Sequence, residues 1–433
     1  PGYGFLSERA GFARLCREAG IVFIGPSPEA MEAMGGKVES RRLMMDAGVP
    51  VVPGGRDPLP DVESAAAFAE QIGFPVMLKA SAGGGGKGMR RIDSAADLPA
   101  AYRSARSEAL ASFGDDAVYL EKFIVDPRHV EIQVMGDLHG KVVSLGEREC
   151  SLQRRHQKVV EEAPSPVVSK DLRRRMGEAA VRAASAVGYS NAGTCEFLLA
   201  ANGEFYFLEM NTRLQVEHPV TEMVTGLDLV ATQIRVAQGE PLDPEFDDVE
   251  PRGHSFEVRL YAEDPFRKFA PSPGTIEVLR LPEGPGVRND CGVYEGAEVS
   301  IHYDPMLAKL IVWAEDRPRA LARLGRALSE LRIEGIRTTV PLFHALLADP
   351  DFTSGNMDIG MLDRKLASGA LALGTAAEEQ GFDVDLALVA AAIDRFERSR
   401  RTSVAASAAS GPTRRTLWRQ AARREGLRRL DFN

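Results

Sequence analysis

A pair of apolar segments joined by Asn202-Gly203 constrains the fold of this chain more than any other feature. Residues 194–201 and 204–211 each have the character of an apolar strand, and Asn-Gly is the preferred pair for a two-residue hairpin turn. The sequence therefore predicts an antiparallel β-hairpin, in which the pairing of the two strands can be counted outward from the turn.

The predicted hairpin brings two carboxylates together. If Ala201 lies opposite Glu204, Glu196 falls directly opposite Glu209. Facing carboxylates repel each other, so the arrangement is reasonable where a hard divalent cation bridges them. Asn211 follows on the same face if the strand continues and offers a further oxygen ligand. The pattern predicts a magnesium site, and the alternative is that one glutamate lies at a solvated edge.

A glycine-rich segment precedes the hairpin. Residues 75–78 predict a buried strand that ends at Lys79, and the following Ser81–Met89 contains four consecutive glycines and Lys87. Glycines let backbone N–H groups surround phosphate oxygens, and a lysine adds positive charge. The segment matches neither the GxxxxGK[ST] loop nor the GxGxxG turn. A flexible loop is the alternative, but a phosphate loop combined with a two-carboxylate magnesium site favours ATP chemistry.

Further strings are dense in polar side chains. Gln153–Lys158, if it forms a strand, places His156 and Lys158 on one face. The string after the hairpin spaces four polar side chains by two residues: Asn211, Arg213, Gln215 and Glu217. A solvated charged loop is the alternative, but direct continuation of the hairpin predicts a small-anion site beside the γ-phosphate. The strand-like Val118–Ile124 carries Glu121, which with backbone groups could bind a purine edge.

Composition excludes several other classes of protein. The net charge of -9 gives no overall attraction to nucleic acid, and no apolar run approaches the length of a membrane span. The four cysteines lie far apart without a CxxC pair, which argues against a zinc site or disulfide framework. A cytoplasmic location is expected. The chain starts at Pro1 without a signal-like segment, so we expect a fragment of a longer protein.

Hydrophobic patterns predict an α/β and α+β protein with several domains. Residues 1–53, with a helix near Glu8–Ala19 and an apolar run at Ile21–Ile24, have the pattern of an α/β domain remnant. Residues 54–123 form a small glycine-rich lid with helices at 62–72 and 95–110, and residues 124–368 form the main core. Residues 369–433 contain a helical pattern at 383–398, a linker and a basic end, which is either a partner-docking segment or a solvated helix.

Four strings, in this order, resemble those of biotin carboxylases of the ATP-grasp superfamily: Pro1–Glu8, Lys79–Met89, Gln153–Glu162 and Glu209–Glu217. The resemblance covers about residues 1–365. It implies an ATP-grasp fold with a partial N-terminal α/β domain, a lid and a large mixed-sheet domain. Two departures are a shorter leading α/β stretch and Gly36, where the family usually has an acidic residue before the position of Lys37.

The resemblance also implies roles for individual residues. It implies that ATP is bound by Lys37, Lys79, Gly85, Gly86, Glu121, Lys122, Phe123, Ile124, His129, His156, Glu196 and Glu209. It implies that Glu196, Glu209 and Asn211 hold Mg²⁺ or Mn²⁺, and that Lys158, Arg213, Gln215, Val216 and Arg288 surround bicarbonate and biotin. The implied catalytic residues are Lys158, Arg213, Glu217 as the base and Arg288 beside the biotin enolate.

The implied activity is that of an ATP-dependent ligase that carboxylates biotin with bicarbonate. No Ala-Met-Lys-Met-type biotinylation site is present, so biotin is expected on a biotin carboxyl carrier protein or a missing segment. A carboxyltransferase subunit and a homodimer or larger complex are the other expected partners, and the final acceptor, an acyl-CoA or pyruvate, stays open. Alternatives are another bicarbonate-activating ligase, such as a carbamoyl-phosphate synthetase half, and a non-catalytic assembly subunit.

Overall fold

A computed structural model describes residues 4–55, 58–81, 89–373 and 389–395. The chain divides into two units, Pro1–Leu373 and Gly374–Asn433. In the second unit, residues 389–395 are helical, within the range expected to form a helix. Within the described residues, no helix has both the length and the apolar character needed to cross a bilayer.

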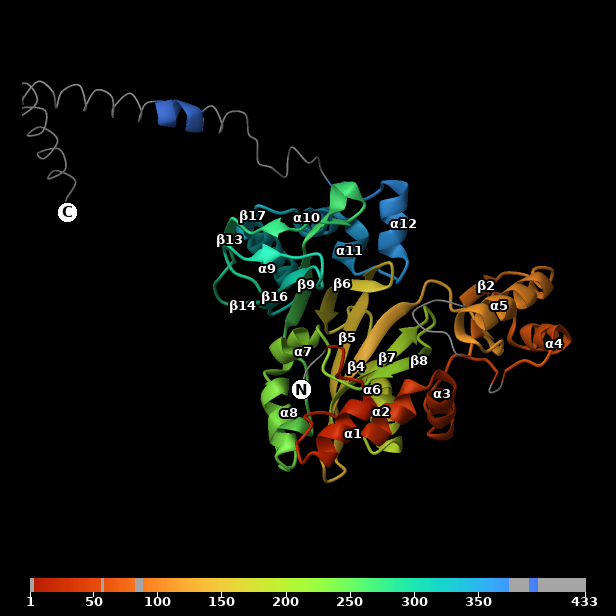
Figure 1. The fold of residues 1–433 in the computed structure, drawn as a ribbon. Helices are drawn as coiled ribbons and strands as arrows, with labels where there is room; N and C mark the ends of the chain where they lie inside the picture. Colours follow the sequence, from red (N-terminus) through yellow and green to blue (C-terminus); the bar gives the residue numbers. More distant parts are fainter. Residues whose placement is uncertain (1–3, 56–57, 82–88, 374–388, 396–433) are drawn as a thin grey trace, which may run out of the picture. The chain divides into compact units, whose positions relative to one another are not determined.

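An eight-stranded antiparallel sheet forms the centre of the first unit, in the order β14-β16-β9-β6-β5-β4-β7-β8 (Figure 1). Its strands are β4 (Arg128–Gly136), β5 (Val142–Arg154), β6 (Gln157–Ala163), β7 (Asn191–Leu199), β8 (Phe205–Asn211), β9 (His254–Tyr261), β14 (Val287–Cys291) and β16 (Met306–Ala314). Most of these strands coincide with apolar runs of the sequence. β14 differs from them: three of its five residues, Val287–Cys291, are polar, and the strand is half-buried.

The two faces of β4 and β5 differ in chemistry because successive side chains of a strand point to opposite sides. Val130, Ile132 and Val134 pack with the buried stripe of α6 (Lys170–Ala186). On the other face Glu131 accepts a hydrogen bond from Arg148, which also reaches Thr221 of α7 (His218–Thr225). One face of the sheet is therefore an apolar core, and the other carries buried charge.

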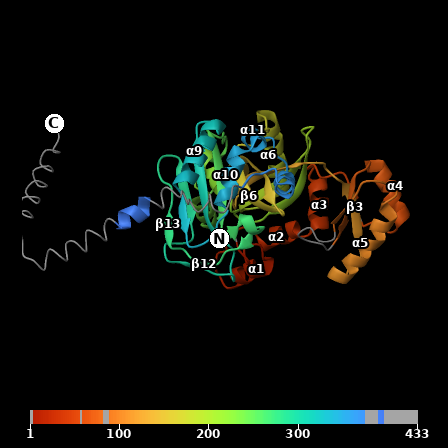
Figure 2. The ribbon, with the colours of Figure 1, turned by 90° about the horizontal axis from the view of Figure 1, so that it is seen from above.

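A three-stranded sheet, β2-β1-β3, lies in the segment expected to form the lid. β1 (Val76–Ala80), β2 (Met89–Ile92) and β3 (Val118–Lys122) pack with α4 (Val62–Ile72) and α5 (Leu98–Phe113) around an apolar core of their own. Figure 2 shows α4, α5 and β3 gathered together. The domain limits at residues 53, 123 and 368 stay a prediction.

The remaining α-helices of the described residues pack on the sheets or on one another. They are α1 (Ala10–Glu18), α2 (Pro28–Gly35), α3 (Lys37–Asp46), α8 (Leu229–Ala237), α9 (Arg317–Glu330), α10 (Val340–Ala348), α11 (Pro350–Ser354) and α12 (Met361–Ser368). Helix α9 covers β9 and β16, and α10 packs against α9 in the same apolar core, the largest of the described residues. The apolar run Ile21–Ile24 forms no strand, because among the described residues none pairs with it, and Ile21 and Val22 are exposed.

The hairpin β7–β8 has the predicted Glu196–Glu209 pair but not the predicted turn. Ala200, rather than Ala201, lies opposite Glu204, since the Ala200 N–H donates to the Glu204 carbonyl. The loop therefore has three residues and ends at Gly203, whose φ of +81° is readily adopted by glycine. A bulge between Glu196 and Phe197 in the pairing with β8 shifts the register back by one residue.

Candidate active site

A cavity of about 830 Å³ lies between the three-stranded sheet and the charged face of the large sheet. Fifteen residues predicted from the sequence line it: Lys79, Glu121, Lys122, Phe123, Ile124, His129, His156, Lys158, Glu196, Glu209, Asn211, Arg213, Gln215, Val216 and Glu217. Gly85 and Gly86 lie outside the described residues, as does the side chain of Lys37, which begins α3. The structure thus gathers residues that lie far apart in the sequence around one space.

Lys158 lies where three carboxylates meet. Its Nζ is 2.5 Å from Glu131, 2.9 Å from Glu196 and 2.6 Å from Glu217. Burial opposes the charged form of Lys158, but the three carboxylates outweigh it and raise the pKa of the amine well above its ordinary value. The same lysine outweighs burial to lower the pKa of Glu217, so Glu217 is ionised and able to accept a proton.

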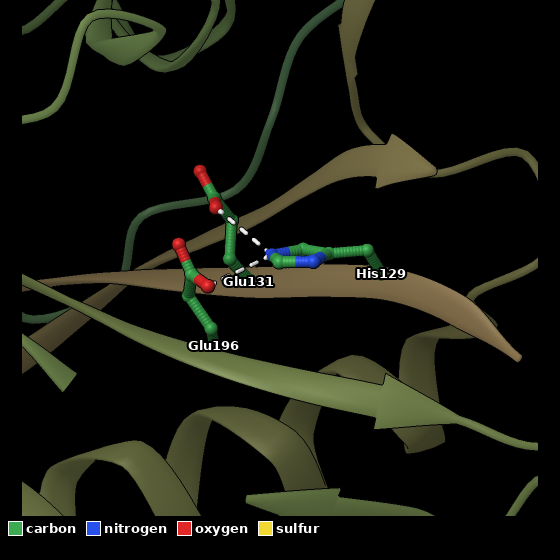
Figure 3. A group of neighbouring side chains, drawn as sticks. All are labelled: His129, Glu131 and Glu196. Atoms are coloured by element: carbon green, nitrogen blue, oxygen red, sulfur yellow. Dashed lines mark ion pairs between the residues drawn. The ribbon is translucent and has the colours of Figure 1, made fainter. Parts of the chain in front are cut away.

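His129 faces two of these carboxylates (Figure 3). Its Nε2 is 3.2 Å from Glu196 and 3.6 Å from Glu131. Burial lowers the pKa of His129, yet the charge of Glu196 and hydrogen bonds to both carboxylates raise it to about 9. The ligand atoms of this trio lie within 4.8 Å of one another, as in a metal site. Lys158 also contacts both carboxylates, so the place where a metal ion would bind between Glu131 and Glu196 is occupied by the side chains of Lys158 and His129.

Arg148 anchors the floor of the cavity and was not predicted from the sequence. It is fully buried and donates to Glu131 at 2.6 Å, to Gln133 at 2.6 Å and to Gln215 at 2.9 Å. Gln215 in turn donates to Glu196 at 2.8 Å. The only sequence signal was the recurrence of polar residues on β4 and β5, where apolar ones are usual.

Arg259, on β9, is the arginine beside the proposed base. It lines the cavity, and its Nη2 donates to Glu217 at 2.9 Å while its Nε donates to Glu161 at 2.7 Å. Arg288, which the sequence assigned to this region, is not among the lining residues. It lies on β14 and is paired with Glu222 at 2.6 Å and with Asp290 at 2.8 Å.

Two side chains predicted to bind ATP are occupied by structural contacts. The carboxylate of Glu121 pairs with Lys79 and, at 2.9 Å, with Arg41. Lys122 Nζ donates to the carbonyls of Gly73 and Phe74 at 2.9 and 3.0 Å. Both side chains therefore brace the strand end that forms the cavity wall.

The strings 153–158 and 211–217 differ from the extended form expected. Arg155 and His156, with φ of +51° and +65°, form the tight turn between β5 and β6. Gln153 is consequently paired opposite Lys158, and His156 does not share a strand face with it. β8 ends at Asn211, and Glu217 is the N-cap of α7. The side chains of both strings nevertheless line one cavity, because turns bring them there instead of the alternating faces of a strand.

Comparison with known proteins identifies the family. Models of the biotin carboxylase N-terminal and C-terminal domains match residues 1–31 and 257–364, and a model of the carbamoyl-phosphate synthase L chain ATP-binding domain matches residues 36–245. Biotin carboxylase 2 of Bacillus subtilis (strain 168) is 52% identical over 366 residues, which cover 84% of this chain and 82% of that protein. The chain belongs to the biotin carboxylase family. The predicted family is thereby confirmed.

Solved structures of biotin carboxylases agree with this assignment. A biotin carboxylase–β,γ-ATP complex from Campylobacter jejuni has a TM-score of 0.78 and 49% identity, and covers 84% of this chain and 81% of its own. The biotin carboxylase domain dimer of Hydrogenobacter thermophilus 2-oxoglutarate carboxylase, in complex with MgADP, ADP and bicarbonate, has a TM-score of 0.77 and 48% identity, with the same coverage. The predicted ATP-grasp fold and ATP-dependent ligase activity are confirmed.

One relative matches more of the chain than those above. The propionyl-CoA carboxylase alpha chain of Ruegeria pomeroyi is 47% identical over 427 residues, which cover 93% of this biotin carboxylase and 62% of that protein. The family models end at residue 364, and a match that covers 93% of the chain must therefore include residues beyond them.

Proposed function

We propose that Lys158, Glu217 and Arg259 form the bicarbonate centre of this biotin carboxylase. The observation that carries the proposal is the pair of cations around one carboxylate: Glu217 lies 2.6 Å from Lys158 and 2.9 Å from Arg259. A small anion that enters here would meet two fixed positive charges and an ionised base. Arg259 thus takes the part that the sequence assigned to Arg288.

Magnesium fits the oxygen-rich side of the same cavity. Glu196 and Glu209 are direct partners in the hairpin, and Asn211 donates to Glu196 at 2.9 Å. Carboxylate and amide oxygens are the ligands that magnesium prefers, so these residues would hold it. When bound, magnesium neutralises charge on the phosphates of ATP.

The proposed reaction begins with proton transfer to Glu217. Glu217 accepts the proton of bicarbonate, and a bicarbonate oxygen attacks the γ-phosphorus in line, so that ADP leaves and carboxyphosphate forms. Carboxyphosphate breaks down to CO₂ and phosphate. Phosphate then takes the N1′ proton of biotin, whose enolate form is held by Arg259 and attacks CO₂. Arg213, held by Glu8 at 3.0 Å, and Gln215 line the same space.

We further propose that this chain acts in an acyl-CoA carboxylase of the propionyl-CoA type. The extended match to a propionyl-CoA carboxylase alpha chain supports this acceptor over acetyl-CoA or pyruvate. The biotin would be presented by a carrier protein or carrier domain, and the carboxyl group would pass to a carboxyltransferase subunit. A homodimer is expected by analogy with the dimeric biotin carboxylase domain of the thermophilic relative.

Transfer of labelled carbonate to free biotin tests the bicarbonate centre. The wild-type protein with ATP and magnesium is expected to form labelled carboxybiotin, and Lys158→Gln to form it at a rate lower by two orders of magnitude or more. Lys170→Gln is the matched control, because Lys170 is exposed and its nearest carboxylate, Glu250, is 4.0 Å away. Equal rates for Lys158→Gln and Lys170→Gln would contradict the proposal.

A further inference from the structure

Two buried glutamates lie directly behind the bicarbonate centre. Glu161 on β6 and Glu257 on β9 are opposite each other in the register, and both side chains are wholly buried. Ile311, the partner of Glu257 on β16, packs with Val220 and Val224 of α7, which covers these three strands (Figure 1). The pair is therefore closed off from solvent by a helix.

Most of the oxygens of this pair have no hydrogen-bond partner among the described residues. Both oxygens of Glu257 and Oε2 of Glu161 are buried without one. An ionised carboxylate is very costly to bury in this state, whereas a protonated one needs only an acceptor for its O–H. Burial, reinforced by the charge of Glu161 and opposed by Lys309, raises the pKa of Glu257 well above its ordinary value.

The neighbouring cations have their own partners. Arg259 donates to Glu161 Oε1 at 2.7 Å and to Glu217 at 2.9 Å. Lys309, opposite Arg259 on β16, donates to the carbonyl of Val216 at 2.7 Å and pairs with Asp290 at 3.2 Å. Neither cation has a hydrogen bond to Glu257, and Glu161, directly opposite in the register, has its Oε2 buried without a partner.

We propose that Glu257 is a carboxylic acid that donates its proton to Oε2 of Glu161 and thereby positions Arg259 toward Glu217. This inference rests on the proposed function of Arg259 and Glu217. With the proton shared, Glu161 presents a single charge and binds Arg259 through Oε1 only. Were both glutamates ionised, their combined charge would draw Arg259 and Lys309 away from the cavity. Glu257 is thus a positioning residue that never touches the substrate.

Infrared difference spectroscopy tests the protonation state without reference to catalysis. The difference spectrum, obtained at neutral pH by subtracting the spectrum of Glu257→Gln from that of the wild type, is expected to contain the carbonyl stretching band of a protonated carboxylic acid. Glu162→Gln is the matched control: Glu162 adjoins Glu161 and is equally buried, but pairs with His254 at 2.6 Å and Arg317 at 2.7 Å. Its difference spectrum should contain carboxylate bands alone. A carboxylate signature for Glu257 would overturn the inference even if the bicarbonate centre is as proposed.

Kinetics test the positioning role. Glu257→Leu removes the donor, so its Michaelis constant for bicarbonate is expected to rise about tenfold. Glu257→Gln keeps an N–H donor, so the rise in its Michaelis constant should be several-fold smaller. Melting temperatures and circular dichroism measured alongside separate this effect from unfolding. Equal losses in the two variants would overturn the positioning role. If Glu257→Leu does not fold, a tenfold rise for Glu257→Gln alone would do the same.

Discussion

Replacing Arg259 and Arg288 in turn tests which of the two arginines acts in the bicarbonate centre. The structure favours Arg259, whereas the sequence favoured Arg288. Arg259→Ser removes the cation that pairs with Glu161 and one of the two cations on Glu217, both in a buried site. Loss of one member of a buried ion pair costs about 3–5 kcal/mol of stability, and loss of a donor aimed at developing charge lowers kcat by about 10²–10³-fold. Arg288→Ser breaks partly exposed pairs outside the cavity, which is worth about 0–1 kcal/mol.

The assay is phosphate release from ATP together with carboxybiotin formation, measured for both variants. Arg259→Ser is expected to lose carboxybiotin formation far more than Arg288→Ser, and Arg259→Lys to fall between them because it keeps a charge but not the planar fork. Urea unfolding of each variant defines the folded fraction, so that rates refer to folded enzyme. The reasoning is refuted if Arg288→Ser loses carboxybiotin formation by 10²-fold while Arg259→Ser stays within a few-fold of wild type.

Three further predictions follow from the charges around the cavity. Glu209→Gln should lower magnesium-dependent ATP turnover by orders of magnitude without lowering the melting temperature of the metal-free protein, since it removes a charge opposite Glu196; the control is the turn variant Glu204→Gln. Lys158→Gln should lower the free energy of unfolding by about 3–5 kcal/mol, because three carboxylates lose their shared cation, and urea titration measures this. Burial raises the pKa of Glu257 well above its ordinary value, so the folded state keeps a proton that the unfolded chain releases; stability should fall as the pH rises above the ordinary pKa of a glutamate, and Glu257→Gln should remove that part of the slope of melting temperature against pH.

The hairpin illustrates how far sequence reasoning reaches. The Glu196–Glu209 pair was predicted by counting from a two-residue turn, and the pair is present although that turn is not. A three-residue loop shifts the register by one residue, and a bulge shifts it back. Bulges respond to the packing of neighbouring strands, so local residue preferences do not reveal them.

Arg259 and Arg148 were missed for a different reason. Both lie within strands that mix polar and apolar residues, and an arginine there gives no local sign of its partners. Their roles depend on β5, β6 and β9 being neighbours, which is a property of the sheet order. Alternating polar residues such as Ser255, Glu257 and Arg259 indicate a charged face, but the string alone does not identify what that face contacts.

Phosphate release from ATP in the presence and absence of bicarbonate tests the central claim most directly. With magnesium present, the account predicts slow release without bicarbonate, a clear rise when bicarbonate is added, and further stimulation by free biotin. Lys158→Gln should abolish the bicarbonate-dependent part. ATP cleavage that is unaffected by bicarbonate in the wild-type protein, or bicarbonate dependence that survives in folded Lys158→Gln, would contradict the account.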